Sequence, residues 1–124
     1  MGMTHVTTQI FDFHKTGKPY EAEFLVDTGA MDCMADCIVS AEELERIGIR
    51  KEQKSMYELA SGERVEYELG FARIAVMGQE TVSPVIFGPK GIEPILGVLV
   101  LESLGFIVDP TDKQLKKLPA RPLK

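Results

Sequence analysis

The sequence predicts an all-β domain, mainly antiparallel, with one or two short helices. Its apolar residues fall in many short segments, several alternating with polar residues as in half-buried strands, and turns containing Gly or Pro separate them. Only two short segments carry apolar residues at helical spacing. A length of 124 residues and a hydrophobic fraction of 44% suit a single domain with one core. We expect residues 1–124 to form that domain, with its core over about 6–109 and a tail over 110–124.

The first predicted elements are a hairpin and a short helix. Segments 6–13 and 20–27 are rich in β-branched and aromatic residues, and the turn 15–19 between them contains Gly and Pro. The second arm runs directly into an Asp-Thr-Gly tripeptide. Further along, Ser40-Ala41-Glu42-Glu43 has the spacing of a capping box, which predicts a helix that Gly48 can end in a left-handed conformation.

The rest of the chain predicts a second hairpin, further strands and a second helix. Leu101 and Leu104 recur at helical spacing before Gly105, which can end the helix. The predicted strands are short apolar or alternating segments bounded mostly by Gly, Pro or charged residues: 56–59, 65–69, 72–76, 82–87, 95–96, 106–109 and 114–118. The first two of these flank 60–64 and form the second hairpin.

Charge and hydropathy exclude several classes of function. The chain has 14 Lys and Arg against 19 Asp and Glu, a net charge of −5, and nucleic-acid affinity depends on basic residues that neutralise phosphates. The longest apolar run, 95–101, falls far short of the roughly 20 residues that cross a bilayer. The first residues lack a basic segment followed by an apolar one, so we expect no secretion signal. We therefore expect a cytoplasmic protein with no nucleic-acid partner and no membrane association.

The cysteines do not suggest a metal site. Cys33 and Cys37 are too few for a disulfide framework and lack the second ligand pair that a closed zinc site needs. Asp32 or Asp36 could complete four ligands, but structural zinc sites rich in carboxylates are uncommon. We expect no metal and no other cofactor.

Two motifs and their order suggest a family. Phe24-Leu25-Val26-Asp27-Thr28-Gly29-Ala30 places Asp-Thr-Gly after an apolar strand, and Ile95-Leu96-Gly97 begins 65 residues beyond Ala30, before a predicted helix. Over about residues 6–109 the chain resembles the retropepsin-like aspartic proteases, single-domain relatives of pepsin. It is most similar to small prokaryotic members, whose last motif reads much like 95–105. The resemblance implies the acid-protease barrel and aspartic endopeptidase activity.

The resemblance also assigns roles to residues. Peptide hydrolysis without a metal can use two carboxylates, and this sequence holds one Asp-Thr-Gly, so the resemblance implies a homodimer in which Asp27 of each copy meets its twin. The implied catalytic residues are Asp27, Thr28 and Gly29. Gly97 would pack behind the active loop, which is the loop that carries Asp-Thr-Gly, and support it. The residues implied to bind substrate are Ala30, Met31, Asp32 and, at the tip of the second hairpin, Ala60, Ser61 and Gly62.

The chain departs from viral members of the family at two positions. Those enzymes commonly carry an acidic residue after Asp-Thr-Gly-Ala and a basic one after the Gly of the late motif, which form an ion pair that steadies the dimer. Met31 and Val98 occupy these places. Because both charges are absent together, no charge is left unpaired, but the dimer is expected to be weaker.

Other interpretations stay open from the sequence alone. Asp27 could serve only to accept amide hydrogen bonds in a tight turn. The domain could also be a homodimeric peptide-binding module of the same fold with little or no turnover. Tyr57 and Tyr67 could contact substrate, but cross-strand packing is the commoner role of aromatic residues in a hairpin, and we leave them out of the site. The expected partners are a peptide or protein substrate and a second copy of the chain.

Overall fold

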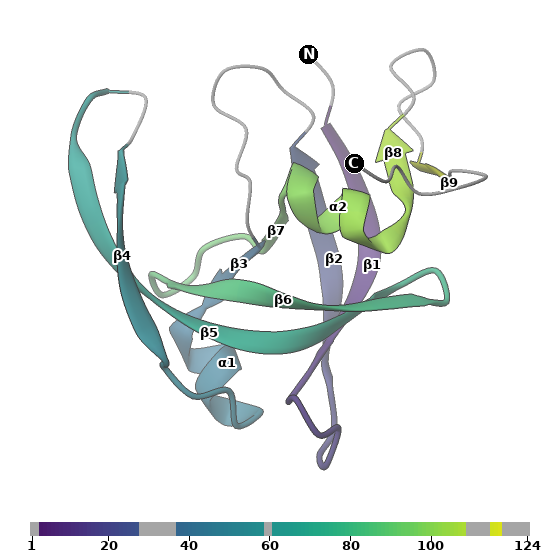
Figure 1. Ribbon diagram of the computed structural model, residues 1–124, viewed down its shortest axis with the longest axis horizontal. Coiled ribbons are helices and arrows are strands. Elements are labelled where there is room, and N and C mark those ends of the chain that lie inside the picture. Colours follow the sequence, from purple (N-terminus) through teal and green to yellow (C-terminus); the bar gives the residue numbers. More distant parts are fainter. Residues whose placement is uncertain (1–2, 28–36, 59–60, 109–114, 118–124) are drawn as a thin grey trace.

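A computed structural model describes residues 3–27, 37–58, 61–108 and 115–117 (Figure 1). In chain order the elements are β1 (Met3–Phe11), β2 (Tyr20–Asp27), β3 (Cys37–Ser40), α1 (Ala41–Arg46), β4 (Gln53–Glu58), β5 (Arg64–Val76), β6 (Gln79–Gly88), β7 (Ile95–Leu96), α2 (Val98–Leu104), β8 (Phe106–Val108) and β9 (Leu115–Lys117). Strands predominate and both helices are short, so the predicted all-β class is confirmed. The C-terminal tail contributes β9, which falls within the range 114–118 predicted for the last strand.

Seven strands form one sheet in the order β1-β2-β7-β3-β6-β5-β4, and β1 also pairs with β5. This extra pairing joins β1, at one edge of the sheet, to β5, which lies next to the opposite edge strand. Most neighbours are antiparallel, but β2 and β7 run parallel, as do β3 and β6. Strands β8 and β9 form a separate antiparallel pair. The predicted first hairpin is confirmed, with Val6 opposite Phe24 in the β1–β2 register.

One apolar core joins the curved sheet to α2 and the small β8–β9 pair. Its largest fully buried side chains include Ile10, Phe24, Ile74, Leu96 and Leu104. Phe106 from β8 is buried in the same cluster, and Leu115 from β9 packs against it. Because burying one such side chain contributes about 1.5–3 kcal/mol, α2 and β8 are held to the sheet mainly by apolar contacts.

Strand β5 corrects one sequence-based prediction. Segments 65–69 and 72–76 were predicted as separate strands, each from its own alternation of apolar and polar residues. They form one strand of 13 residues. Gly70 is buried, and a Cβ atom built on it would overlap the carbonyl oxygen of Arg50 and lie 2.9 Å from Cγ2 of Ile49. The glycine therefore allows the 49–50 backbone to approach the strand without interrupting it.

Strand β3 was not predicted. All four of its residues are buried, so the segment shows no alternation of polar and apolar side chains. It leads into α1, where the predicted capping box is not realised, since the Ser40 side chain makes no capping hydrogen bond. Gly48 and Gly105 do adopt the expected left-handed conformation, with φ of 87° and 89°. No helix among the described residues is long and apolar enough to cross a membrane.

Candidate active site

Asp27 ends the strand that leads to the Asp-Thr-Gly motif. Strand β2 runs parallel to β7, with Leu25 opposite Ile95 and Val26 opposite Leu96. The amide of Leu25 also donates to the carbonyl oxygen of Pro94 over 2.9 Å. One further step of this register brings Asp27 level with Gly97. The two motifs, far apart in the sequence, thus meet at neighbouring strand ends.

Gly97 turns the chain from β7 into α2 within a single residue. It is buried and extended, with φ −85° and ψ 165°, and occupies the N-cap position of the helix. Its carbonyl oxygen accepts the amide of Leu101 over 3.2 Å. Val100 and Leu101 of the helix are buried in the core. The helix therefore packs behind the end of β7, where the resemblance expects support for the active loop.

Strand β3 lies on the other side of β7, with Ile38 opposite Ile95. The neighbours of β7 are therefore β2, which ends at Asp27, and β3, which begins at Cys37. The segment that connects them, 28–36, carries half of the predicted site residues and lies outside the described residues, as does the side chain of Asp27. The predicted site residues outside the description are Thr28, Gly29, Ala30, Met31, Asp32 and Ala60.

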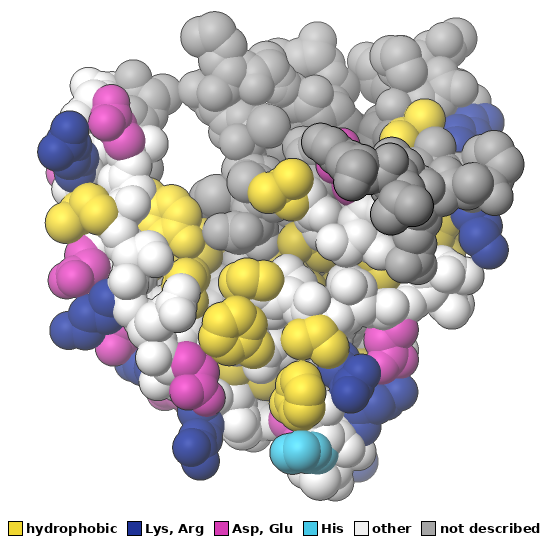
Figure 2. Space-filling view, in the orientation of Figure 1, with side chains coloured by type: hydrophobic (Ala, Val, Ile, Leu, Met, Phe, Trp, Pro, Cys, Tyr) yellow, Lys and Arg dark blue, Asp and Glu magenta, His cyan; other side chains and the backbone are white. Residues whose placement is uncertain are grey.

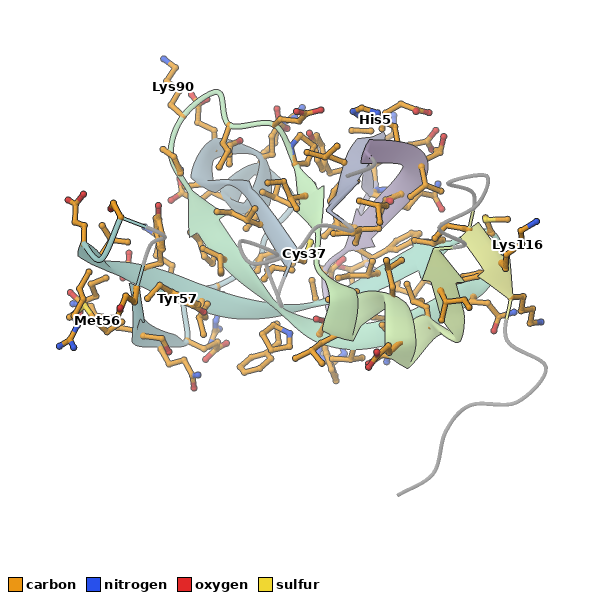
Figure 3. The ribbon with its side chains drawn as sticks, turned by 90° about the horizontal axis from the view of Figure 1, so that it is seen from above. His5, Cys37, Met56, Tyr57, Lys90 and Lys116 are labelled. Atoms are coloured by element: carbon orange, nitrogen blue, oxygen red, sulfur yellow. The ribbon has the colours of Figure 1, made fainter. Side chains whose placement is uncertain are left out.

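The β4–β5 hairpin has one apolar face and one polar face. In its register Ser55 lies opposite Tyr67 and Tyr57 opposite Val65, and all four side chains are half-buried. The intervening residues are mostly charged and exposed, and Glu58 and Arg64 form a cross-strand ion pair of 3.7 Å on that side. Figure 3 shows Tyr57 on the side of the hairpin toward Cys37 and Met56 on its outer side.

The apolar face of the hairpin belongs to a second hydrophobic cluster that reaches β7. Ile38, Leu69 and Ile86 are buried at its centre, and the half-buried residues packed against them are Tyr57, Tyr67, Ile92 and Ile95. The two tyrosine rings lie 5.9 Å apart at 59°, so the predicted cross-strand packing is confirmed. Their face nevertheless points toward β7, the strand that leads into Gly97, which sequence reasoning did not reveal. In Figure 2 the hairpin stands away from the centre of the molecule, with open space beside it.

The hairpin tip contains the remaining predicted site residues. Ser61 and Gly62 are exposed, and the Ser61 hydroxyl oxygen accepts the Glu63 amide over 3.3 Å. Gly62 has φ +92°, a conformation that side chains with a Cβ rarely adopt. The tip is thus a tight turn whose geometry depends on this glycine.

A hydrogen bond between side chains crosses the end of β2. His5 of β1 and Glu93, in the segment before β7, lie on opposite sides of this strand, and their Nε2 and Oε2 atoms are 2.9 Å apart. Both side chains are about half exposed, so the pair contributes little to stability. It does tie β1 to the segment that leads into β7 and Gly97.

The described residues contain no group of three or more His, Cys, Asp or Glu that could hold a metal ion. Cys37 is fully buried in β3 and packs in the main core. The hydrophobic cluster that includes the apolar face of the hairpin consists of aliphatic and aromatic side chains. Such a surface suits an apolar peptide segment better than a metal ion. No protein-family model and no curated protein matches the chain in comparisons with known proteins.

Proposed function

We propose that the chain is an aspartic endopeptidase that acts as a homodimer, with Asp27 of each copy supplying one carboxylate of the catalytic pair. The observation that supports this most is the meeting of two motifs: β2 ends at Asp27 beside the turn from β7 through Gly97 into α2. A hairpin with an aromatic inner face stands beside the same strands. These are the elements that the resemblance to retropepsin-like proteases requires, in the same order.

The chemistry needs two carboxylates in different protonation states. Two carboxylates at hydrogen-bonding distance repel each other and share one proton. The ionised group removes a proton from water, and the water oxygen bonds to the peptide carbonyl carbon while the protonated group hydrogen-bonds to the carbonyl oxygen. The C–N bond then breaks as a proton passes to the nitrogen. Because one copy has a single Asp-Thr-Gly, a monomer would lack half of the pair.

The substrate in this proposal is an extended peptide. It would lie between the hairpin and the strand ends, with main-chain hydrogen bonds of the kind that hold an added strand. Tyr57, Tyr67 and Ile95 offer an apolar and aromatic wall for its side chains. Ser61 and Gly62 would lie over it at the hairpin tip.

The decisive experiment replaces the proposed catalytic carboxylate. Asp27→Asn keeps the size of the side chain but removes its ability to exchange a proton, so cleavage of an unstructured protein should fall by about 10²- to 10⁴-fold. Asp36→Asn is the matched control and should retain activity, because Asp36 lies outside the motif. Thermal unfolding of both variants checks that the fold is kept.

Three outcomes would refute the proposal. Hydrolysis that survives Asp27→Asn would show that Asp27 is not catalytic. A wild-type protein that binds peptides but leaves them intact would instead be the binding module considered above. Titration with a statine peptide, which mimics the tetrahedral intermediate, adds the stoichiometry: one inhibitor for two chains is expected, and one for each chain would exclude a shared site.

A further inference from the structure

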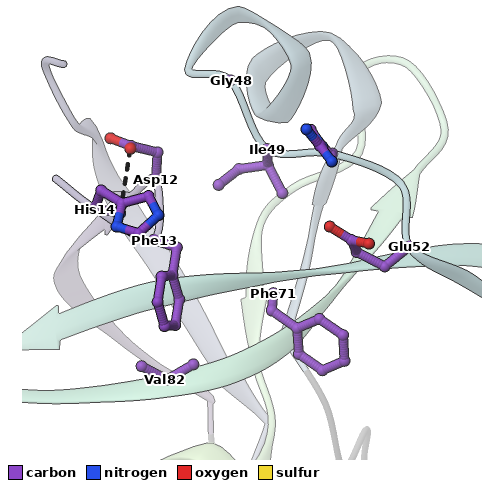
Figure 4. A pocket seen from close by; sticks show the side chains of 9 residues that line it. Asp12, Phe13, His14, Gly48, Ile49, Glu52, Phe71 and Val82 are labelled. Carbon is purple, nitrogen blue, oxygen red and sulfur yellow. Dashed lines mark hydrogen bonds between the residues drawn. The ribbon is translucent and has the colours of Figure 1, made fainter. Parts of the chain in front are cut away.

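A groove lies on the face of the sheet that exposes Phe71 and Val82 (Figure 4). Its volume is about 600 Å³, within the range of pockets that bind ligands. It is lined by the β1–β2 turn, the connection between α1 and β4, and the outer faces of β5 and β6. The residues are Asp12, Phe13, His14, Gly48, Ile49, Arg50, Glu52, Phe71 and Val82.

The walls of this groove are apolar and unusually exposed. Phe13, Phe71 and Val82 are 45%, 40% and 42% exposed, and each comes from a different element. Their side chains stand around one hollow in Figure 4, with Ile49 on its far side. Apolar side chains gathered in this way mark a binding surface more often than scattered ones do.

Other contacts fix the walls in place. The Nε of Arg73 donates to the carbonyl oxygen of Phe13 over 2.7 Å, and its guanidinium carbon lies 5.0 Å from the centre of that ring. The Asp12 carboxylate accepts the Thr16 amide over 2.8 Å and the Thr16 hydroxyl over 3.0 Å, which closes the turn that carries Phe13. A site whose walls are ordered before binding avoids the cost of ordering them during it.

The rim of the groove adds charges of both signs. Glu52 and Arg50 are exposed, and their side chains form no hydrogen bond or ion pair with any other residue that the structure describes. The carboxylate of Glu52 can therefore take a basic group of a ligand. The guanidinium of Arg50 can donate to carbonyl oxygens, and an extended ligand without internal hydrogen bonds has such oxygens free.

The chain itself contains a segment with these properties. Residues 118–124 read Leu-Pro-Ala-Arg-Pro-Leu-Lys, with Pro119 and Pro122 three positions apart. Prolines at this spacing favour the polyproline II helix, which has three residues per turn and leaves its carbonyl groups unpaired. Proline-rich helices of this kind bind grooves lined by aromatic side chains. Arg121 and Lys124 carry positive charges that can pair with the Glu52 carboxylate, which has no partner among the described residues.

We propose that this groove binds residues 118–124 of a second copy of the chain. In Figure 1, β9, which ends at Lys117 where the segment starts, lies at the end of the molecule opposite the β1–β2 turn and α1. Strand β2, whose 8 residues extend over about 26 Å, runs from one of these ends toward the other in Figure 1. A seven-residue polyproline II segment spans only about 22 Å, so it cannot both cross this distance and lie in the groove of its own molecule.

The experiment uses the full chain with Asp27→Asn, so that a peptide is not cleaved should the proposed activity exist. Pro119→Ala and Pro122→Ala in the same chain stop its own segment from competing. A peptide of residues 116–124 is then titrated and followed by amide resonances. Saturable shifts at Phe13, Ile49 and Phe71 are expected. Because no catalytic group is involved, the result does not depend on the proposed protease function.

Matched variants locate the contacts. Phe71→Ala should weaken binding at least about tenfold, since aromatic anchors dominate such interfaces. Met56→Ala removes another exposed apolar side chain, on the outer face of the hairpin, and should leave the affinity unchanged. Glu52→Arg should weaken binding of the natural peptide by about three- to fivefold, and a peptide with Arg121→Glu should regain that factor.

Three results would overturn the proposal. No saturable shift at millimolar peptide would show that the groove does not recognise this segment. Equal affinity for a scrambled peptide would show that the proline spacing is not recognised. In the chain with its natural tail, groove resonances should depend on protein concentration, because the segment comes from another molecule. The groove resonances of the natural chain could instead differ from those of the proline variant by an amount that does not change on dilution. That result would mean that each molecule binds its own tail.

Discussion

Replacing Gly70 by alanine tests the close packing that makes β5 one continuous strand. A Cβ atom at this position would overlap the carbonyl oxygen of Arg50, lie 2.9 Å from Cγ2 of Ile49 and lie 3.1 Å from Cε1 of Phe87. The Ile49 side chain can adjust, but a backbone carbonyl can move only if the 49–50 segment leaves the strand. Overpacking of a core costs about 1–3 kcal/mol, and we expect the upper end, about 3 kcal/mol, because backbone must shift.

The assay for Gly70→Ala is equilibrium unfolding in urea together with thermal unfolding. With a slope of about 2 kcal/mol/M, a loss of about 3 kcal/mol lowers the urea midpoint by roughly 1.5 M. The melting temperature should fall by roughly 12 °C, at about 4 °C for each kcal/mol in a chain of this size. Gly17→Ala is the control: nothing lies within 4 Å of its added Cβ, and it should be neutral or slightly stabilising. A Gly70→Ala midpoint equal to that of the wild type would refute the packing argument.

Three further predictions concern the dimer, metal and pH. Specific activity should rise with protein concentration and then level off. A roughly ninefold excess of inactive Asp27→Asn chains should lower the activity per wild-type chain about tenfold once subunits exchange. Full activity of a protein that sediments as a monomer would exclude a shared site. EDTA should leave hydrolysis unchanged, and activity that disappears with chelator and returns with zinc would contradict the carboxylate mechanism. Desolvation acts to raise the pKa of Asp12, but hydrogen bonds from the side chain of Thr16 and the amides of Gly17, Thr16 and His14 outweigh it and hold this pKa below its usual value of 3.8. The ionised form of Asp12 therefore stabilises the fold above about pH 4, and this contribution is lost as pH falls through the lowered pKa. Asp12→Asn should lower the stability at pH 7, and the variant should then lose less stability than the wild type when the pH is lowered. Equal loss of stability in acid for both proteins would contradict this.

Elements with a local signal could be predicted from the sequence, and those that depend on distant partners could not. The first hairpin follows from two β-rich arms around a Gly-Pro turn, and α2 follows from helical spacing before Gly105. Strand β3 gives no such signal, because it is buried on both faces between β6 and β7. The division of β5 into two predicted strands was wrong because each segment was judged by its local alternation, whereas the close packing of Gly70 against residues 49–50 involves a separate part of the chain.

The candidate site could be predicted in part for the same reason. Asp27 and Gly97 carry motifs, so their meeting could be expected, and the parallel β2–β7 register explains it physically. The position of Tyr57 and Tyr67 on the inner face depends on which side of the hairpin faces β7, and alternation alone does not fix that side. The groove beside Phe13 and Phe71 is assembled from four separate segments, none of which carries a motif of its own.

The continuity of β5 limits how the hairpin can move. A lid normally swings about a few loop residues that absorb the change in backbone angles. Here the arm runs without interruption from Arg64 to Val76, and the amide of Glu52 donates to the carbonyl oxygen of Leu69 over 2.7 Å at the foot of the other arm. The hairpin thus has no hinge at its base. Any opening of the hairpin would have to come from bending of the paired strands and from the turn at Gly62, so such motion would be small at Leu69 and would increase toward the tip.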